Sequence, residues 1–319
     1  MPYKSPMSYV YGMMLMFLAA CSFGTAAIFI KLAYRAGLQP AGLLPLQNLV
    51  SLACLWPLML GFAGFPRLNR QQARRVFWQG LLGNFGISVC YFWSAQRIDV
   101  SVLSIILFTY PGLVLCYEIR VRKRRASALE YLALFLSAAG AVMAVDPFHR
   151  TAGGIDGVGL LLAVGAAAAY AFLILCGKTL AGDLPPLAIS TLTSTVSTIA
   201  MMAVLHPKHW FSLAVLQQGW WHIAVVAVLS TVVPMNLMYL GLRRMGAFHA
   251  SIISVAELPC ILVLAYFILS ERMTASQLLG GGMILLSFLL IRPEGRAAIG
   301  EEIPSDNQES AGGDTSNLR

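Results

Sequence analysis

One carboxylate stands inside an apolar run that is long enough to cross a membrane. Glu257 is the only aspartate, glutamate, lysine or arginine between Arg244 and Glu271, and Pro259 follows it by two residues. A charge in hydrocarbon costs about 2.5–3.5 kcal/mol, so Glu257 is expected to face protein, a partner or water. The proline frees a backbone carbonyl that a cavity or a neighbouring helix must satisfy. Together they predict a lumen in which Glu257 binds a proton or pairs with a cationic part of a solute; the alternative is a neutral, hydrogen-bonded packing residue.

Other polar side chains are spaced so that they could line the same lumen. Asn84, Ser88 and Tyr91 follow one another at i, i+4 and i+7, which places them on one face of a helix. The remaining candidates are polar or aromatic residues inside other apolar runs, namely Asn236, Tyr110, Tyr170 and Ser254. With Glu257, these residues form the predicted substrate-binding set. For each of them the alternative is a hydrogen bond between helices, worth about 0.6 kcal/mol.

Three further patterns each leave two interpretations open. Seven hydroxyl residues occupy the run from Ser190 to Thr198, where they either contact a solute or bond their own i−4 carbonyls. The triplet Gly280-Gly281-Gly282 predicts a close helix approach, within the chain or at a homodimer contact. Lys31 and Lys178 end two apolar runs, where they either reach the membrane interface or act as gate residues.

No pattern typical of an enzyme accompanies these residues. The sequence has neither a phosphate-binding loop nor a nucleophile elbow. His206 and His209 lack an acid at metalloprotease spacing, and the six cysteines lie inside apolar runs without metal-ligand spacing. We therefore expect no enzyme activity, no cofactor and no metal ion.

The elements that must position the candidate residues are transmembrane helices. Of the 319 residues, 58% are hydrophobic and 11% are charged, about half the charged share of a soluble domain. A span needs about 20 apolar residues, and the chain has many such runs. The net charge of +8 does not indicate a nucleic-acid partner, because the basic residues lie in short segments between the runs. The composition predicts an all-α polytopic membrane protein in contact with the lipid bilayer.

The apolar runs predict ten spans. They cover about residues 9–30, 43–62, 76–95, 100–119, 129–145, 158–176, 187–205, 220–240, 247–269 and 275–291. With the N-terminus inside the cell, 16 of the 22 lysines and arginines fall on the inner side, which predicts cytoplasmic termini. Residues 293–319 have too few apolar groups to order themselves and are predicted to be a disordered, acidic, cytoplasmic tail.

The runs also suggest an internal repeat. Lys31 and Lys178, which end the first and sixth spans, are 147 residues apart, and Pro111 and Pro259 are 148 apart. Residues 1–146 and 157–292 would then form two repeats of five helices. Because five is odd, the second repeat must enter the membrane upside down, as in transporters that bind substrate near the midplane between inverted repeats. The alternative is chance similarity between apolar helices.

The last two predicted spans carry an ordered series of motif residues: Arg243, Arg244, Gly246, Ala250, Ser251, Ser254, Pro259, Glu271, Arg272, Met273, Thr274, Gln277 and Gly280. This series resembles the EamA family of the drug/metabolite transporter superfamily. The resemblance implies two EamA-like five-helix repeats and is silent on the substrate. Related transporters often carry a basic residue inside the second span, where this chain has Gln47 and Asn48.

The resemblance implies a secondary active transporter in the inner membrane of a bacterium. We expect it to export a small organic solute, such as an amino acid or related metabolite, by alternating access of a central lumen, with protons as one candidate coupling ion. An importer or exchanger on the same fold is the first alternative. An intramembrane enzyme using Glu257 is the second.

Overall fold

The computed structural model describes residues 6–36, 40–146, 156–204 and 213–291. Within them every regular element is a helix; the labels η1, η2 and η5 mark π-helical turns. In chain order the elements are α1 Pro6–Arg35, α2 Pro40–Leu58, η1 Met59–Ala63, α3 Arg70–Trp78, η2 Gln79–Phe85, α4 Gly86–Ala95, α5 Val100–Leu107, α6 Tyr110–Arg120, α7 Ala128–Val145, α8 Gly157–Asp183, α9 Pro186–Val204, α10 Leu213–Ala227, η5 Val228–Val232, α11 Val233–Leu242, α12 Ala247–Ser254, α13 Glu257–Leu269 and α14 Ala275–Leu289. The predicted tail, 293–319, and His206 and His209 lie outside the described residues.

Eight of the helical segments are long and apolar enough to cross a membrane. They correspond to the first, second and fourth to ninth predicted spans. The predicted third span lies within the unbroken helical run of α3, η2 and α4, where Gln79, Asn84 and several glycines make the segment less apolar. The predicted tenth span appears as α14, an apolar helix of 15 residues. Large apolar side chains such as Phe62, Phe135 and Phe267 point outward, as expected of a surface that faces lipid.

Two of the eight spans are broken in the middle. The segment Val100–Arg120 consists of α5 and α6, and Ala247–Leu269 consists of α12 and α13. In each, a proline stands just after the break: Pro111 in the first turn of α6 and Pro259 in the first turn of α13. Proline is tolerated there because the first turn of a helix needs no N–H donor. The sequence predicted both prolines inside continuous helices, and the structure places them at the start of separate ones.

Apart from η1, the same order of described elements occurs twice along the chain. The capping box of α7, Ser127 with Glu130, recurs 147 residues later as the capping box of α14, Thr274 with Gln277. A π-helical turn interrupts both the α3–α4 run and the α10–α11 run. Local sequence signals therefore produce matching helix starts and interruptions in the two halves.

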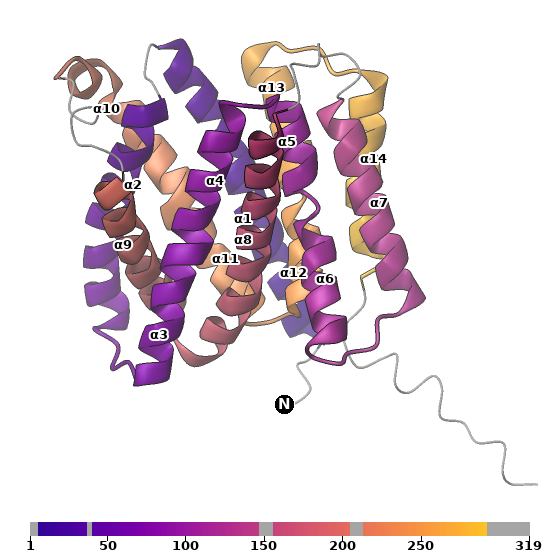
Figure 1. Ribbon diagram of the computed structural model, residues 1–319, viewed down its shortest axis with the longest axis horizontal. Coiled ribbons are helices and arrows are strands. Elements are labelled where there is room, and N and C mark those ends of the chain that lie inside the picture. Colours follow the sequence, from indigo (N-terminus) through magenta and orange to yellow (C-terminus); the bar gives the residue numbers. More distant parts are fainter. Residues whose placement is uncertain (1–5, 37–39, 147–155, 205–212, 292–319) are drawn as a thin grey trace, which may run out of the picture.

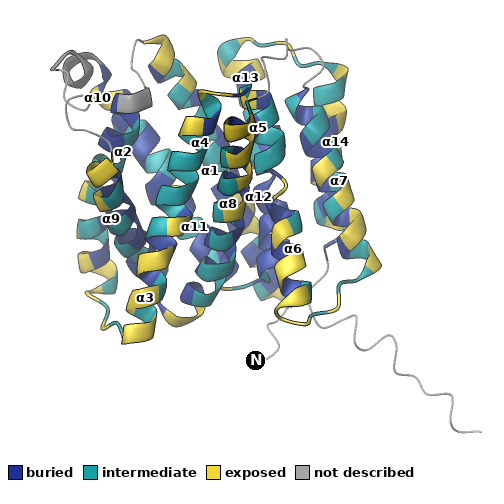
Figure 2. Ribbon diagram, in the orientation of Figure 1, coloured by how far each residue is buried: buried dark blue, intermediate teal, exposed yellow. Residues whose placement is uncertain are grey.

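The first helix of each half packs mainly against the other half. Helix α1 contacts α10, α11, α12 and α13, whereas α8 contacts η2, α4, α5 and α6. Figure 1 shows the helices side by side, with α1 and α8 inside the bundle and α7 and α14 together at one edge. In Figure 2 the buried residues gather on the inner helices, and the exposed ones lie along outer faces such as those of α3, α6 and α7. The interior is therefore built jointly by both halves.

A glycine contact joins α7 to α14. A Cβ added to Gly280 would lie 2.4 Å from the Ala144 nitrogen and 2.6 Å from the Gly140 oxygen. The close helix approach predicted from the glycine triplet thus occurs within the chain. The neighbouring Gly282 has no heavy atom within 4 Å of such a Cβ, so it has no part in this contact.

We expect Gly280→Ala to lower the free energy of unfolding by about 1–3 kcal/mol, because the backbone of α7 must move to admit the methyl group. Thermal unfolding of the purified protein in lipid nanodiscs measures this. The matched control is Gly282→Ala, which places the same methyl group in open space. Equal stability of the two variants would contradict the close packing.

Candidate solute-binding cavity

A cavity of about 220 Å³ lies between the two halves of the chain. Its lining residues come from α1, α2, η2, α4 and α5 of the first half and from α8, α9, η5, α11 and α13 of the second. The volume is smaller than the roughly 300–1,000 Å³ of a drug-sized ligand site. The cavity therefore suits a small metabolite.

Glu257 lines this cavity as the first residue of α13. The break after Ser254 places its carboxylate at a helix N-terminus, where the helix dipole stabilises negative charge. The side chain is partly buried, and among the described residues no side chain donates a hydrogen bond to it and no lysine or arginine pairs with it. The carboxylate is thus positioned to receive a proton or a cationic group.

Of the predicted face of Asn84, Ser88 and Tyr91, the first two line the cavity. Tyr91 instead packs against a separate apolar cluster that includes Ile98 and Leu103. Ser88 and Tyr91 both belong to α4, so Tyr91 lies almost one helical turn further along the same helix. At that level α4 meets residues of α5, and the side chain packs there instead of in the cavity lining.

The other predicted residues are divided between the cavity and its surroundings. Tyr170 lines the cavity. Tyr110 packs against Tyr170, and the centroids of their two rings are 4.2 Å apart. Tyr110 is buried and donates its hydroxyl to the Ser251 carbonyl at 3.0 Å. Ser254 donates to the carbonyl of Ala250, four residues earlier.

Asn236 faces a different groove, which α2, η1, α9 and α11 line. Its Nδ2 donates to the Val232 carbonyl at 2.7 Å, and its Oδ1 accepts a hydrogen bond from Ser190 at 3.2 Å. The structure therefore brings Glu257, Asn84, Ser88 and Tyr170 together in one cavity and places the other four predicted residues outside its lining.

The hydroxyl groups of helix α9 divide between backbone hydrogen bonds and the cavity lining. Thr191, Thr193 and Thr195 each donate to their own i−4 carbonyl. Ser194 and Ser197 line the cavity, and Ser230 and Thr231 of η5 also line it. The three threonines therefore satisfy backbone carbonyls of their own helix, and the two serines belong to the cavity wall.

Gln47 and Asn48 of α2 were not among the predicted site residues, yet both line the cavity. Two adjacent amides just inside an apolar span were the signal that could have identified them. Gln47 Oε1 is buried and has no hydrogen-bond partner among the described residues. Asn48 Nδ2 donates to the Met201 sulfur at 3.3 Å.

A buried hydrogen-bonded cluster lies directly behind one wall of the cavity. Gln79 Nε2 donates to the Leu173 carbonyl at 3.0 Å and to the Tyr239 hydroxyl oxygen at 3.2 Å. Leu173 and Met238, next to Tyr239 in sequence, line the cavity. A Cβ added to Gly177 would lie 3.0 Å from the Tyr239 ring, so α8 and α11 pack closely at this level. The cavity is closed on this side.

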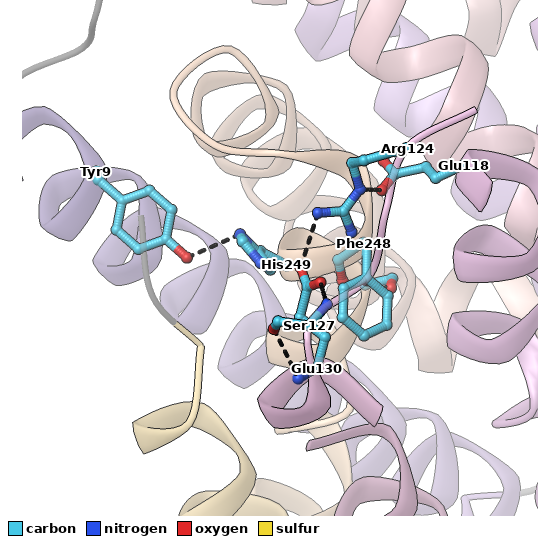
Figure 3. Close-up of polar contacts among 8 residues, drawn as sticks. Tyr9, Glu118, Arg124, Ser127, Glu130, Phe248 and His249 are labelled. Atoms are coloured by element: carbon cyan, nitrogen blue, oxygen red, sulfur yellow. Dashed lines mark hydrogen bonds and ion pairs between the residues drawn. The ribbon is translucent and has the colours of Figure 1, made fainter. Parts of the chain in front are cut away.

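A second polar cluster ties four parts of the chain together at the end of the bundle where α1 begins (Figure 3). Tyr9 bonds His249 at 3.0 Å, and His249 bonds Glu130 at 2.9 Å. Arg124, in the segment between α6 and α7, lies 2.8 Å from Glu130 and 3.0 Å from Glu118. Both carboxylates and His249 are buried.

The sequence analysis missed this cluster, because Arg124 was grouped with the basic residues that orient the protein in the membrane. The Ser127-to-Glu130 capping-box spacing was the signal available. It explains how Glu130 is held: Ser127 and Glu130 exchange hydrogen bonds between side chain and backbone N–H.

Two thiols meet near Glu257. Cys21 Sγ of α1 and Cys260 Sγ of α13 are 2.8 Å apart, and Cys260 is three residues after Glu257. Within the described residues no group of histidine, cysteine or acidic side chains could hold a metal ion.

A bundle of apolar helices around a polar cavity is the arrangement of a polytopic membrane protein that handles a small solute. The EamA-like transporter family matches this sequence twice, at residues 10–145 and 157–292. The chain therefore belongs to the EamA-like transporter family, as the resemblance of its last two spans implied.

Curated relatives agree with this assignment, and a solved structure shares the fold. The chain is 23% identical to the uncharacterized transporter YcbK of Bacillus subtilis, over 85% of this chain and 89% of the relative. It is 25% identical to the threonine/homoserine exporter RhtA of Escherichia coli K12, over 79% of this chain and 82% of that protein. A solved protein crystal structure superposes with a TM-score of 0.70 at 15% identity, covering 88% of this chain and 95% of the other. That likeness supports the fold alone.

Proposed function

We propose that the protein is a secondary active transporter that exports a small organic solute, such as an amino acid or related metabolite. The observation that carries this proposal is the cavity between the two halves, with the unpaired carboxylate of Glu257 in its wall. The similarity to RhtA, a threonine/homoserine exporter, supports the solute class and the direction. Protons are the candidate coupling ion, because a carboxylate without a cationic partner can bind and release one.

The proposed architecture is ten transmembrane helices in two inverted EamA-like repeats, residues 1–146 and 157–292. The recurrence of helix breaks, π-helical turns and capping boxes at matching places supports it. The proposed mechanism is alternating access, in which the closed side behind Gln79 and Tyr239 opens in turn with the other side. An intramembrane enzyme is disfavoured, because no second carboxylate lines the cavity in the described part of the chain.

A direct test compares the metabolites in the medium of cells that overproduce the protein and cells that lack it. An exporter enriches its solute in the first medium. Uptake of that solute into vesicles containing the purified protein then shows whether the protein itself moves it. Depletion from the medium of the overproducing cells would identify an importer instead, and no flux of any solute would contradict transport.

For the orientation, we expect reporters fused after Arg75, Arg125 and Arg292 to report the cytoplasm and a reporter fused after Arg150 to report the opposite side. The physical reason is the excess of lysine and arginine on the inner side. Paired phosphatase and fluorescent-protein fusions measure this. A cytoplasmic signal at Arg150 would contradict the scheme of five spans in each repeat.

A further inference from the structure

The hydrogen bonds within the cavity wall determine which polar atoms remain without a partner and can bind a ligand. Thr193 Oγ1 donates its only hydrogen to backbone carbonyls, at 2.7 Å to Ile189, so toward Asn84 it can only accept. Asn84 Nδ2 donates to it at 3.4 Å. In this orientation of the Asn84 amide, Oδ1 is a buried acceptor without a partner among the described residues.

Two neighbouring side chains in the wall also donate hydrogen bonds to other protein atoms. Ser88 Oγ donates to the Asn84 carbonyl at 2.9 Å, and Asn48 Nδ2 donates to the Met201 sulfur. Gln47 adds a second unpartnered oxygen, Oε1, on a side chain that is only 8% exposed. The two unpartnered amide oxygens in this part of the wall therefore favour a ligand that donates hydrogen bonds.

The charge of the cavity has the same preference. Glu257 brings a carboxylate, and no lysine or arginine is among the described residues that line the cavity. A bound carboxylate would stand near Glu257 with no cation to offset the repulsion. A bound ammonium group brings a positive charge and N–H donors for the carboxylate and the amide oxygens.

We propose that this cavity recognises the ammonium group of a small amine, which binds to Glu257 with Asn84 Oδ1 and Gln47 Oε1 as further acceptors. The inference rests on the proposed function only in taking this cavity as the solute site, and it does not depend on transport. It makes Glu257 a specificity-determining residue and narrows the solute class to molecules that carry a protonated amine.

The test uses four compounds with the same carbon chain: butylamine, 2-aminobutyrate, butan-1-ol and butyrate. Binding to the purified full-length protein in lipid nanodiscs is measured by calorimetry at neutral pH and constant ionic strength, with a separate titration of sodium chloride against choline chloride. We expect the two compounds with an ammonium group to bind, and butan-1-ol and butyrate to bind at least ten-fold more weakly, because a charge-assisted hydrogen bond is lost.

Variants locate the binding. Glu257→Gln should weaken butylamine binding roughly ten- to a hundred-fold, and Asn84→Leu, which keeps the side-chain shape, roughly two- to ten-fold. The matched control is Glu271→Gln, which removes a carboxylate that pairs with Lys31 outside the cavity. It should leave butylamine binding unchanged. Asn84→Leu keeps the test decisive if Glu257→Gln does not fold.

The outcomes separate this inference from the proposed function. Amine binding that depends on Glu257, in a protein that moves no solute, supports the inference and contradicts transport. Solute flux together with equal binding of butylamine, butan-1-ol and butyrate leaves transport standing and overturns the inference. The inference is also overturned if neither ammonium compound binds. It is likewise overturned if sodium gives a Glu257-dependent signal and butylamine does not.

Discussion

We expect Glu257→Gln to insert and fold normally but to lose most of the solute flux, roughly ten-fold or more. Glutamine keeps the shape of the side chain and its ability to form hydrogen bonds, but it cannot carry the charge that binds a proton or a cationic solute. Because the described residues contain no cationic partner for this carboxylate, folding has little to lose from the change. Flux of the identified solute in vesicles, measured over a pH series beside the wild type, is the readout.

Two comparisons make this result interpretable. Glu271→Gln is the same substitution in a half-exposed pair with Lys31, and such pairs contribute little to stability, so its flux should stay near that of the wild type. A packing role for Glu257 predicts the reverse pattern, in which Glu257→Gln transports normally and Glu257→Leu loses stability. Wild-type flux in Glu257→Gln across the pH series would assign any proton coupling to another residue.

The second large effect is expected for Arg124→Met. Arg124 lies between two buried carboxylates, Glu118 and Glu130, and its removal takes away a cation that both of them contact. Breaking a buried ion pair by removing one partner costs about 3–5 kcal/mol, far more than losing a surface pair. We therefore expect a large drop in the thermal unfolding temperature of the protein in nanodiscs.

Arg125→Met is the matched control, because Arg125 is the next residue and its side chain is exposed. Its stability should remain near that of the wild type. If the two variants were equally stable, the cluster drawn in Figure 3 would not contribute to folding. A further variant that combines Arg124→Met with Glu118→Gln should recover part of the lost unfolding temperature, since one of the two buried carboxylates that Arg124 contacted is then uncharged.

The sequence predicted the helical membrane fold because apolar runs of span length are a local signal. Residue spacing alone predicted the order of the helices and the close approach at Gly280. It also showed the offset between Pro111 and Pro259. The breaks before Pro111 and Pro259 were not predicted, since a proline inside an apolar run fits both a kinked helix and a new helix start. Which of these forms depends on what packs around the freed backbone groups.

Site residues were harder to predict because their direction depends on helix phase and tertiary contacts. Glu257, Asn84, Ser88 and Tyr170 could be proposed from burial cost and spacing, but the spacing of Tyr91 did not show how far along its helix the cavity extends. Gln47 was visible only as an amide in an apolar run. The cluster around Arg124 joins residues that are far apart in the chain, from Tyr9 to His249, so the local capping box at Ser127 and Glu130 could not reveal their partners.

The facing thiols of Cys21 and Cys260 make one movement of this protein open to chemical trapping. An oxidant that removes two electrons and two protons from the pair would join them in a covalent tether between α1 and α13, within one turn of Glu257. Any step that needs these two helices to separate would then stop, and a reducing agent would restore it. The protein thus carries, without an introduced residue, a pair of thiols whose reversible cross-linking can test whether its first helix moves when the cavity opens.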